Sequence, residues 1–169
     1  MISLKAFAPI LASTLGMTPA AIYERQRALV RANLLPVPIG RGRGNGLPAT
    51  AESVALMLIA VMVTDNLSDT DGRVQKLAEA KVQDRCRLTK APTFRAALAA
   101  ILASEKLSAS ITWIVVSRRD LHGSVFFLRG QTHGGSRFGQ DAPFENNLEI
   151  DARINRLGVQ TISKALRPD

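Results

Sequence analysis

Two pairs of arginines near the start of the chain have a spacing that would let them contact a nucleic acid. Arg27 and Arg31 are four residues apart, so on a helix they lie one turn apart on the same side. A guanidinium can donate two parallel hydrogen bonds to guanine O6 and N7, or it can pair with a phosphate. Arg41 and Arg43 follow in the segment PIGRGRGNG, whose glycines let backbone amides approach phosphates closely. These residues predict contact with double-stranded DNA.

The helix that would carry Arg27 and Arg31 has an apolar side and a polar side. At about 100° per residue, Ile22, Leu29 and Val30 fall on the apolar side. The polar side combines small, aromatic, acidic and basic residues, and we predict that it enters the major groove as a recognition helix. Its predicted contact residues are Thr18, Ala20, Tyr23, Glu24, Arg27 and Arg31. A solvated helix surface is the alternative, because every amphipathic helix has a polar side.

Turn and cap residues make this helix the second of a predicted helix-turn-helix. A first helix is expected over residues 4–15, and Gly16 ends it. Thr18 is a favourable N-cap and Pro19 a favourable first helical residue, so the second helix is expected over residues 20–32. Two short helices joined by a tight turn are typical of DNA-binding domains.

The glycine-rich segment comes where a winged helix places its wing. Asn33 can adopt the left-handed conformation that ends the recognition helix, and the segment follows directly. We therefore interpret Arg41 and Arg43 as wing residues that contact phosphates or enter a narrow minor groove. A phosphate-binding Walker loop is excluded because the Gly-Lys-Ser/Thr that it requires is lacking. A flexible linker is the alternative.

The positive charge of the chain is concentrated in the same region. The 169 residues include 22 lysines and arginines and 14 acidic residues, which gives a formal net charge of +8. Residues 1–50 contain six of the basic residues and one acid, whereas residues 51–150 contain 12 basic and 11 acidic residues. Such asymmetry favours a polyanionic partner for the N-terminal third.

Residues that would support catalysis or bind a metal are sparse. His122 and His133 are far apart, and neither has the spacing of a metal-ligand pair. Cys86 has no base close to it in the sequence, so we do not expect a catalytic thiol. An acidic stretch is interpreted as a solvated loop, and its residues are Asp141, Glu145, Glu149 and Asp151. We predict no catalytic residue, no metal and no cofactor, and we do not expect an enzyme.

The single cysteine and the short apolar runs indicate the compartment. One cysteine cannot form an intrachain disulfide, which fits a reducing cytoplasm. The longest apolar run covers ten residues, 54–63, too few to span a membrane. We therefore expect a cytoplasmic, nucleoid-associated protein that does not bind membranes.

The rest of the chain predicts a mainly α, α+β fold with a small β-hairpin. The apolar helix expected over residues 51–63 has no polar side and must be buried nearly all round. Three arginines flank the predicted hairpin and are interpreted as solvated strand ends, with additional phosphate contacts as the alternative: Arg118, Arg119 and Arg129. The other expected elements are helices over 71–87, from 93 onward and over 151–166, a hairpin of 111–117 with 124–129, and a surface loop over 131–147.

Two domains are predicted from this pattern. Residues 1–65 are expected to form a winged helix-turn-helix DNA-binding domain, and residues 66–169 an α+β domain for dimerisation or protein contact. The apolar helix over 51–63 and the final helix both need surfaces that cover them. Because the first two helices offer little area for this, the cover must come from the C-terminal half or from a second copy of the chain. We predict a homodimer with the final helix or the hairpin in its interface.

The stretch LGMTPAAIYERQRALVRANLLP, with the basic segment after it, resembles the winged helix-turn-helix of MerR-like bacterial and phage regulators. It is also similar to the DNA-binding proteins of prophages and bacterial gene transfer agents. The resemblance covers about residues 1–65. It implies a sequence-specific transcriptional activator of phage-like or gene-transfer-agent genes, with RNA polymerase or another transcription factor as a further partner.

Three other classes of function remain open. A DNA-packaging protein of the small-terminase type, or a recombination accessory protein, also uses a helix-turn-helix and would form a ring-shaped oligomer. An RNA-binding protein has less support, because RNA readers usually expose stacking aromatics and only 5% of this chain is aromatic. An enzyme has the least support.

Overall fold

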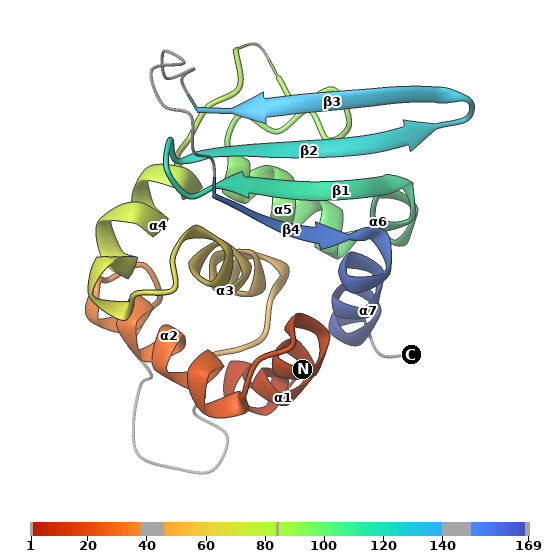
Figure 1. Cartoon of the computed structure of the whole chain (residues 1–169). Helices are drawn as coiled ribbons and strands as arrows, with labels where there is room; N and C mark the ends of the chain where they lie inside the picture. Colours follow the sequence, from red (N-terminus) through yellow and green to blue (C-terminus); the bar gives the residue numbers. More distant parts are fainter. Residues whose placement is uncertain (1, 38–45, 84, 140–149, 168–169) are drawn as a thin grey trace.

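The computed structural model describes residues 2–37, 46–83, 85–139 and 150–167, and these residues form an α+β fold (Figure 1). The four strands make one antiparallel sheet in the order β3-β2-β1-β4. The elements in chain order are α1 (Leu4–Leu15), α2 (Pro19–Arg31), α3 (Ala51–Val63), the 3₁₀ turn η1 (Leu67–Asp69), α4 (Thr70–Ala78), α5 (Phe94–Ala103), α6 (Glu105–Ser110), β1 (Ile111–Ser117), β2 (His122–Arg129), β3 (Thr132–Phe138), β4 (Asp151–Asn155) and α7 (Arg156–Leu166). The predicted α+β class is confirmed.

Local sequence signals account for the first two helices. Gly16 ends α1 in the left-handed conformation, with φ 66° and ψ 33°, which glycine adopts without steric cost. The Thr18 hydroxyl accepts a hydrogen bond from the Ala21 amide at 3.2 Å, and Pro19 is the first residue of α2. Asn33, with φ 57°, reverses the chain after α2. Both helices and their caps are therefore confirmed.

α3 is the centre of the fold. Thr50 and Ser53 form a reciprocal capping box: Thr50 Oγ1 accepts from the Ser53 amide at 3.1 Å, and Ser53 Oγ accepts from the Thr50 amide at 2.9 Å. Residues 54–63 are buried except for the half-buried Val61. The helices α2, α4 and α5 surround α3, and the sheet lies above it in Figure 1. The predicted burial is confirmed, but the cover comes from the same chain, so α3 no longer argues for a second copy.

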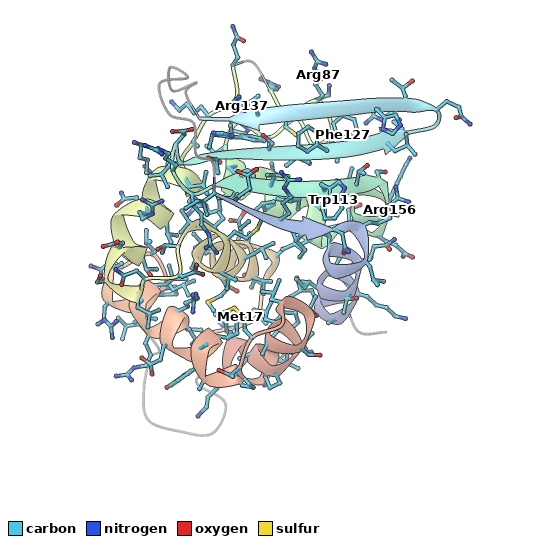
Figure 2. The ribbon with its side chains drawn as sticks, viewed as in Figure 1. Met17, Arg87, Trp113, Phe127, Arg137 and Arg156 are labelled. Atoms are coloured by element: carbon cyan, nitrogen blue, oxygen red, sulfur yellow. The ribbon has the colours of Figure 1, made fainter. Side chains whose placement is uncertain are left out.

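The sheet is larger than the predicted hairpin. The pairing of β1 with β2 confirms that hairpin, but the expected surface loop over 131–147 contains strand β3. Glycines such as Gly134 disfavour strands in isolation. Here the Phe127 ring covers Gly134, where an added Cβ would come within 2.5 Å of the ring, and Figure 2 shows Phe127 between β2 and β3. This cross-strand contact explains why the loop prediction was wrong for β3.

β4 was predicted as the start of the final helix. Residues 151–155 instead pair with β1, and Ile154 lies opposite Ile114 in the core. Asn155 then caps α7, because its Oδ1 accepts from the Gly158 amide at 3.0 Å. Residues 151–155 form a strand because the edge of β1 is available for pairing, and the local sequence does not contain this information.

α4 is also shorter than predicted, since it ends at Ala78 and not near residue 87. The chain after it pairs with the segment that leads into α5. The Phe94 amide donates to Ala80 O at 3.0 Å, and Lys81 bridges to Thr93. These long-range bonds replace the helical bonds of the expected third and fourth turns. The start of α5 is as predicted, with the Thr93 hydroxyl accepting from the Ala96 amide at 3.3 Å.

One face of the sheet packs on the helices. Phe138 of β3 contacts Phe94 of α5, with ring centroids 5.4 Å apart. An added Cβ at Gly123 of β2 would lie 2.6 Å from the Phe94 ring, so this face approaches α5 closely. The core is one continuous cluster that runs from α1 to α7. The predicted boundary between residues 65 and 66 falls just after α3 and stays a prediction.

Candidate nucleic-acid interface

α2 presents the predicted contact residues along one side. Ala20, Tyr23, Arg27 and Arg31 are exposed, and Glu24 is half-buried. The opposite side is held in the core by buried residues that include Ile22, Ala28 and Leu29. Because α2 packs against α1 and α3, its exposed side is fixed in orientation. The structure therefore brings together the residues of α2 that the helical wheel grouped.

Two contacts organise this exposed side. Arg27 pairs with Glu24 at 3.1 Å, and about half of each side chain is exposed to solvent. Such a pair contributes roughly 0.2–1 kcal/mol, so a phosphate or a guanine can replace Glu24 as the partner of Arg27. The ammonium of Lys5 in α1 lies 5.6 Å from the centre of the Tyr23 ring, a cation–π contact. Lys5 thus adds a third cation beside Arg27 and Arg31.

Thr18 has a structural role at this surface. Its Oγ1 accepts from the Ala21 amide, which satisfies one of the free amides at the start of α2. The side chain is exposed, and a hydroxyl can donate its hydrogen while its oxygen accepts. Thr18 can therefore cap α2 and contact a phosphate at the same time.

A shallow hollow of about 240 Å³ runs along α2. Its lining combines the aromatic ring and the two guanidinium groups with one amide and one aliphatic side chain. The lining residues are Tyr23, Gln26, Arg27, Val30 and Arg31. Both arginines therefore border one concave surface that can receive a backbone sugar–phosphate or the edge of a base.

The predicted wing residues Arg41 and Arg43 lie outside the described residues, but both ends of their segment are placed. On one side, the amides of Leu34 and Leu35 donate to Leu29 O at 2.9 and 3.2 Å. On the other side, the Leu4 amide donates to Leu47 O at 2.6 Å, and Ser3 bridges to Pro48. The segment thus leaves from the end of α2 and returns to the start of α1.

Arg25 is one of the six basic residues of the N-terminal third, but it does not contribute to the exposed positive charge. Its side chain is buried, and it donates to Ala21 O at 3.3 Å and to Thr64 O at 3.5 Å. Burial lowers the pKa of the Arg25 guanidinium from its ordinary value, and the nearby Asp65 carboxylate opposes that shift. One of the six basic residues in the N-terminal third is therefore internal and does not face a ligand.

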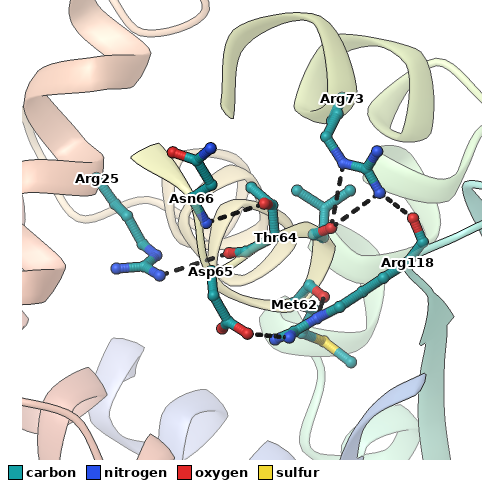
Figure 3. Close-up of polar contacts among 8 residues, drawn as sticks. Arg25, Met62, Thr64, Asp65, Asn66, Arg73 and Arg118 are labelled. Carbon is teal, nitrogen blue, oxygen red and sulfur yellow. Dashed lines mark hydrogen bonds and ion pairs between the residues drawn. The ribbon is translucent and has the colours of Figure 1, made fainter. Parts of the chain in front are cut away.

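Three arginines converge on the carboxyl end of α3, which the sequence did not indicate (Figure 3). Arg118 Nε donates to Met62 O at 3.0 Å, Arg73 Nε donates to Val63 O at 3.4 Å, and Arg25 donates to Thr64 O. Arg118 also pairs with Asp65. Carbonyls at the end of a helix carry partial negative charge and have no partner within the helix. The arginines satisfy them, so the interpretation of Arg118 as a solvated strand end was wrong.

The described part of the chain contains neither a metal-ligand cluster nor a membrane-spanning helix. There, no group of three histidine, cysteine, aspartate or glutamate side chains is arranged to hold a metal ion. Cys86 is buried. Among the described helices, none has both the length and the apolar character needed to cross a membrane. No protein-family model, curated protein or solved structure matches this chain.

Proposed function

We propose that this chain is a sequence-specific DNA-binding transcriptional regulator and that α2 is its recognition helix. The observation that carries the proposal is the exposed side of α2. Arg27 and Arg31 lie one turn apart there, in line with Tyr23 and Ala20, while the core holds the other side.

The shape and chemistry of α2 suit the major groove. The groove is about 12 Å wide and admits one α-helix. Ala20, near the start of α2, leaves room for this end of the helix to approach the bases. Arg27 and Arg31 then supply guanidinium groups for guanine O6 and N7 or for phosphates, and the anchored side prevents the helix from rotating away.

Lys5, Arg41 and Arg43 would supply the surrounding phosphate contacts. Lys5 lies next to Tyr23, and the segment of Arg41 and Arg43 starts and ends at the two helices that form the interface. This supports the winged helix-turn-helix interpretation of residues 1–65. Arginine side chains on such a segment reach the backbone or the minor groove beside the recognition helix.

The biological role is proposed from the resemblance of residues 1–65 to MerR-like, prophage and gene-transfer-agent regulators. It supports activation of phage-like or gene-transfer-agent genes, with RNA polymerase or another transcription factor as a partner. A homodimer would read two half-sites about 34–36 Å apart, or a multiple of that distance. Sedimentation of the full chain on a paired and on a single site tests this dimer, and a ring-shaped oligomer would instead favour a DNA-packaging protein.

The recognition helix is tested by selecting bound sequences from a random duplex library and measuring variants on the preferred site. Arg27→Ala and Arg31→Ala should each cost roughly 1–3 kcal/mol there and much less on random duplex. Arg129→Ala, an exposed arginine at the far end of the sheet, is the matched control and should bind as the unmodified chain does. Equal losses on both kinds of duplex would reduce α2 to a backbone contact.

A further inference from the structure

Two aromatic side chains lie next to each other on the outer face of the sheet. Trp113 of β1 is 43% exposed and Phe126 of β2 is 45% exposed. They are direct partners in the register of the two central strands, which places their Cβ atoms about 4.5–5.5 Å apart. Their neighbours Ile114 and Val125 point into the core, so the two aromatic side chains point away from it.

An irregularity in the strand pairing puts Trp113 on this face. Ile111 pairs with Phe127, whereas Trp113 pairs with Phe126, so β1 contains one residue more than β2 at this point. In a regular strand Ile111 and Trp113 would share a face. The bulge separates them, with Ile111 buried and Trp113 exposed. Bulges of this kind often redirect a side chain beside a functional site.

The outer strands complete the surface around the two rings. Phe126 lies opposite Gly135 of β3, where an added Cβ would be 3.3 Å from the ring. The next set of outward-facing residues that lie side by side across the four strands includes Arg137 on β3 and Arg153 on β4, the two outer strands. With strands about 4.8 Å apart, the backbones of these arginines are roughly 14 Å apart across the sheet.

The charge of this face is positive. On this face the four strands carry two arginines, Arg137 and Arg153, and one acid, Asp151, which pairs with the exposed Arg153 at 3.1 Å. Arg156, the first residue of α7, donates to Ile111 O at 2.8 Å, beside the bulge. Figure 2 shows Trp113 between the ends of the sheet marked by Arg137 and Arg156. Cations therefore border the aromatic pair.

We propose that this surface, the aromatic platform of Trp113, Phe126, Arg137 and Arg153, binds single-stranded nucleic acid. Two successive bases stack on the rings of Trp113 and Phe126, and the guanidinium groups pair with the phosphates. Some four-stranded antiparallel sheets bind single strands by stacking bases on exposed aromatic rings, whereas a duplex keeps its base faces stacked inside the helix. A second copy of the chain is a poorer occupant, because it would bring its own arginines against those of the first.

The test uses the full chain and its single tryptophan. Trp113 fluorescence is measured during titration with a dodecamer of thymidylate and with one of uridylate, and labelled oligomers give the affinity by anisotropy. Stacking should quench the fluorescence. Trp113→Ala and Phe126→Ala should each weaken binding roughly 5- to 150-fold, whereas Trp113→Phe should retain most of the affinity. Comparing the two oligomers shows whether DNA or RNA is preferred.

The controls separate this platform from the proposed duplex site. Leu67→Ala, an exposed apolar residue of η1, should leave the affinity for single strands unchanged. Tyr23→Ala and Arg27→Ala should weaken duplex binding and leave binding to the oligomers unchanged. Thermal melting confirms that each variant is folded.

Two results would overturn the platform. One is that neither oligomer quenches the fluorescence or binds, or that both alanine variants of the platform bind as tightly as the unmodified chain. The other is that the chain sediments as a dimer which Trp113→Ala converts to a monomer, with no binding of either oligomer. The face would then be an interface between copies.

Discussion

Arg118, directly after β1, donates from Nε to the main-chain oxygen of Met62 in α3 across 3.0 Å. This hydrogen bond joins residues 56 positions apart and ties the sheet to the carboxyl end of the central helix. Arg73 of α4 and Arg25 of α2 bond to the next two carbonyls, those of Val63 and Thr64. α2, the central helix α3 and the sheet are therefore held together at one point.

Removing this link should destabilise the chain. Arg118→Ala leaves a helix-end carbonyl without its charged donor, and we expect the free energy of unfolding to fall by about 1.5–3 kcal/mol. Urea denaturation followed by circular dichroism measures the loss. Arg129→Ala, which removes an exposed arginine at the end of β2, should change it by less than about 0.5 kcal/mol. An unchanged midpoint for Arg118→Ala would show that the contact contributes nothing.

The cap of α2 predicts a difference between two substitutions at one position. Thr18→Ala removes the hydroxyl that accepts from the Ala21 amide and should cost about 0.5–2 kcal/mol of stability. Thr18→Ser keeps the hydroxyl and should retain most of that stability. Thermal unfolding of the two variants gives the comparison. Equal losses would mean that the methyl group, and not the cap, is what matters.

Two glycines should respond to alanine in opposite directions. At Gly134 the new Cβ would meet the Phe127 ring, so Gly134→Ala should destabilise the chain by about 1–3 kcal/mol. At Gly72 in α4 nothing lies within 4 Å of the new Cβ, so Gly72→Ala should stabilise it by about 0.4–1 kcal/mol. Denaturation midpoints measure both, and a stable Gly134→Ala would contradict the close packing of Phe127 on β3.

The proposed wing predicts a change in salt dependence. If Arg41 and Arg43 contact phosphates, the double substitution to alanine should weaken binding to every duplex sequence. Each lost contact should reduce the slope of log affinity against log salt concentration by about 0.9. Titrations of one duplex at several salt concentrations give the slope. An unchanged affinity and slope would identify the segment as a linker.

Truncation after residue 65 should disrupt the fold. It removes α4 and α5, which cover the almost wholly buried α3. We expect a fragment of residues 1–65 to show no cooperative thermal transition and to aggregate, because the apolar surface of α3 becomes exposed to water. The full chain under the same conditions is the control. A fragment that melts cooperatively and binds duplex DNA would establish residues 1–65 as an independent domain.

The sequence by itself determined the helices whose signals are local. Gly16, Thr18 and Pro19 predicted the turn and the start of α2, and Thr50 predicted the start of α3. Each acts through residues at most a few positions away, so one short segment contains the whole cause. The apolar composition of residues 54–63 likewise required burial, although it could not name the cover.

Tertiary structure alone decided the elements that depend on distant partners. β3 and β4 have weak local signals and exist because β2 and β1 offer edges and apolar side chains to pair with. The aromatic pair also depends on distant partners. The low aromatic content of the sequence argued against exposed stacking residues. In the folded chain, a bulge and the cross-strand register bring Trp113 and Phe126 together outside the core.

Arg25 and Arg27 show why the sequence alone cannot distinguish a structural cation from one that is free to bind a ligand. They are two residues apart on α2 and carry the same charge. In the sequence, both add to the positive charge that predicts a polyanionic partner. Arg25 faces the end of α3, where free carbonyls offset the cost of burying a cation, whereas Arg27 faces solvent and remains available to a ligand. Which cation is structural depends on where the end of another helix lies, and only the folded chain specifies that.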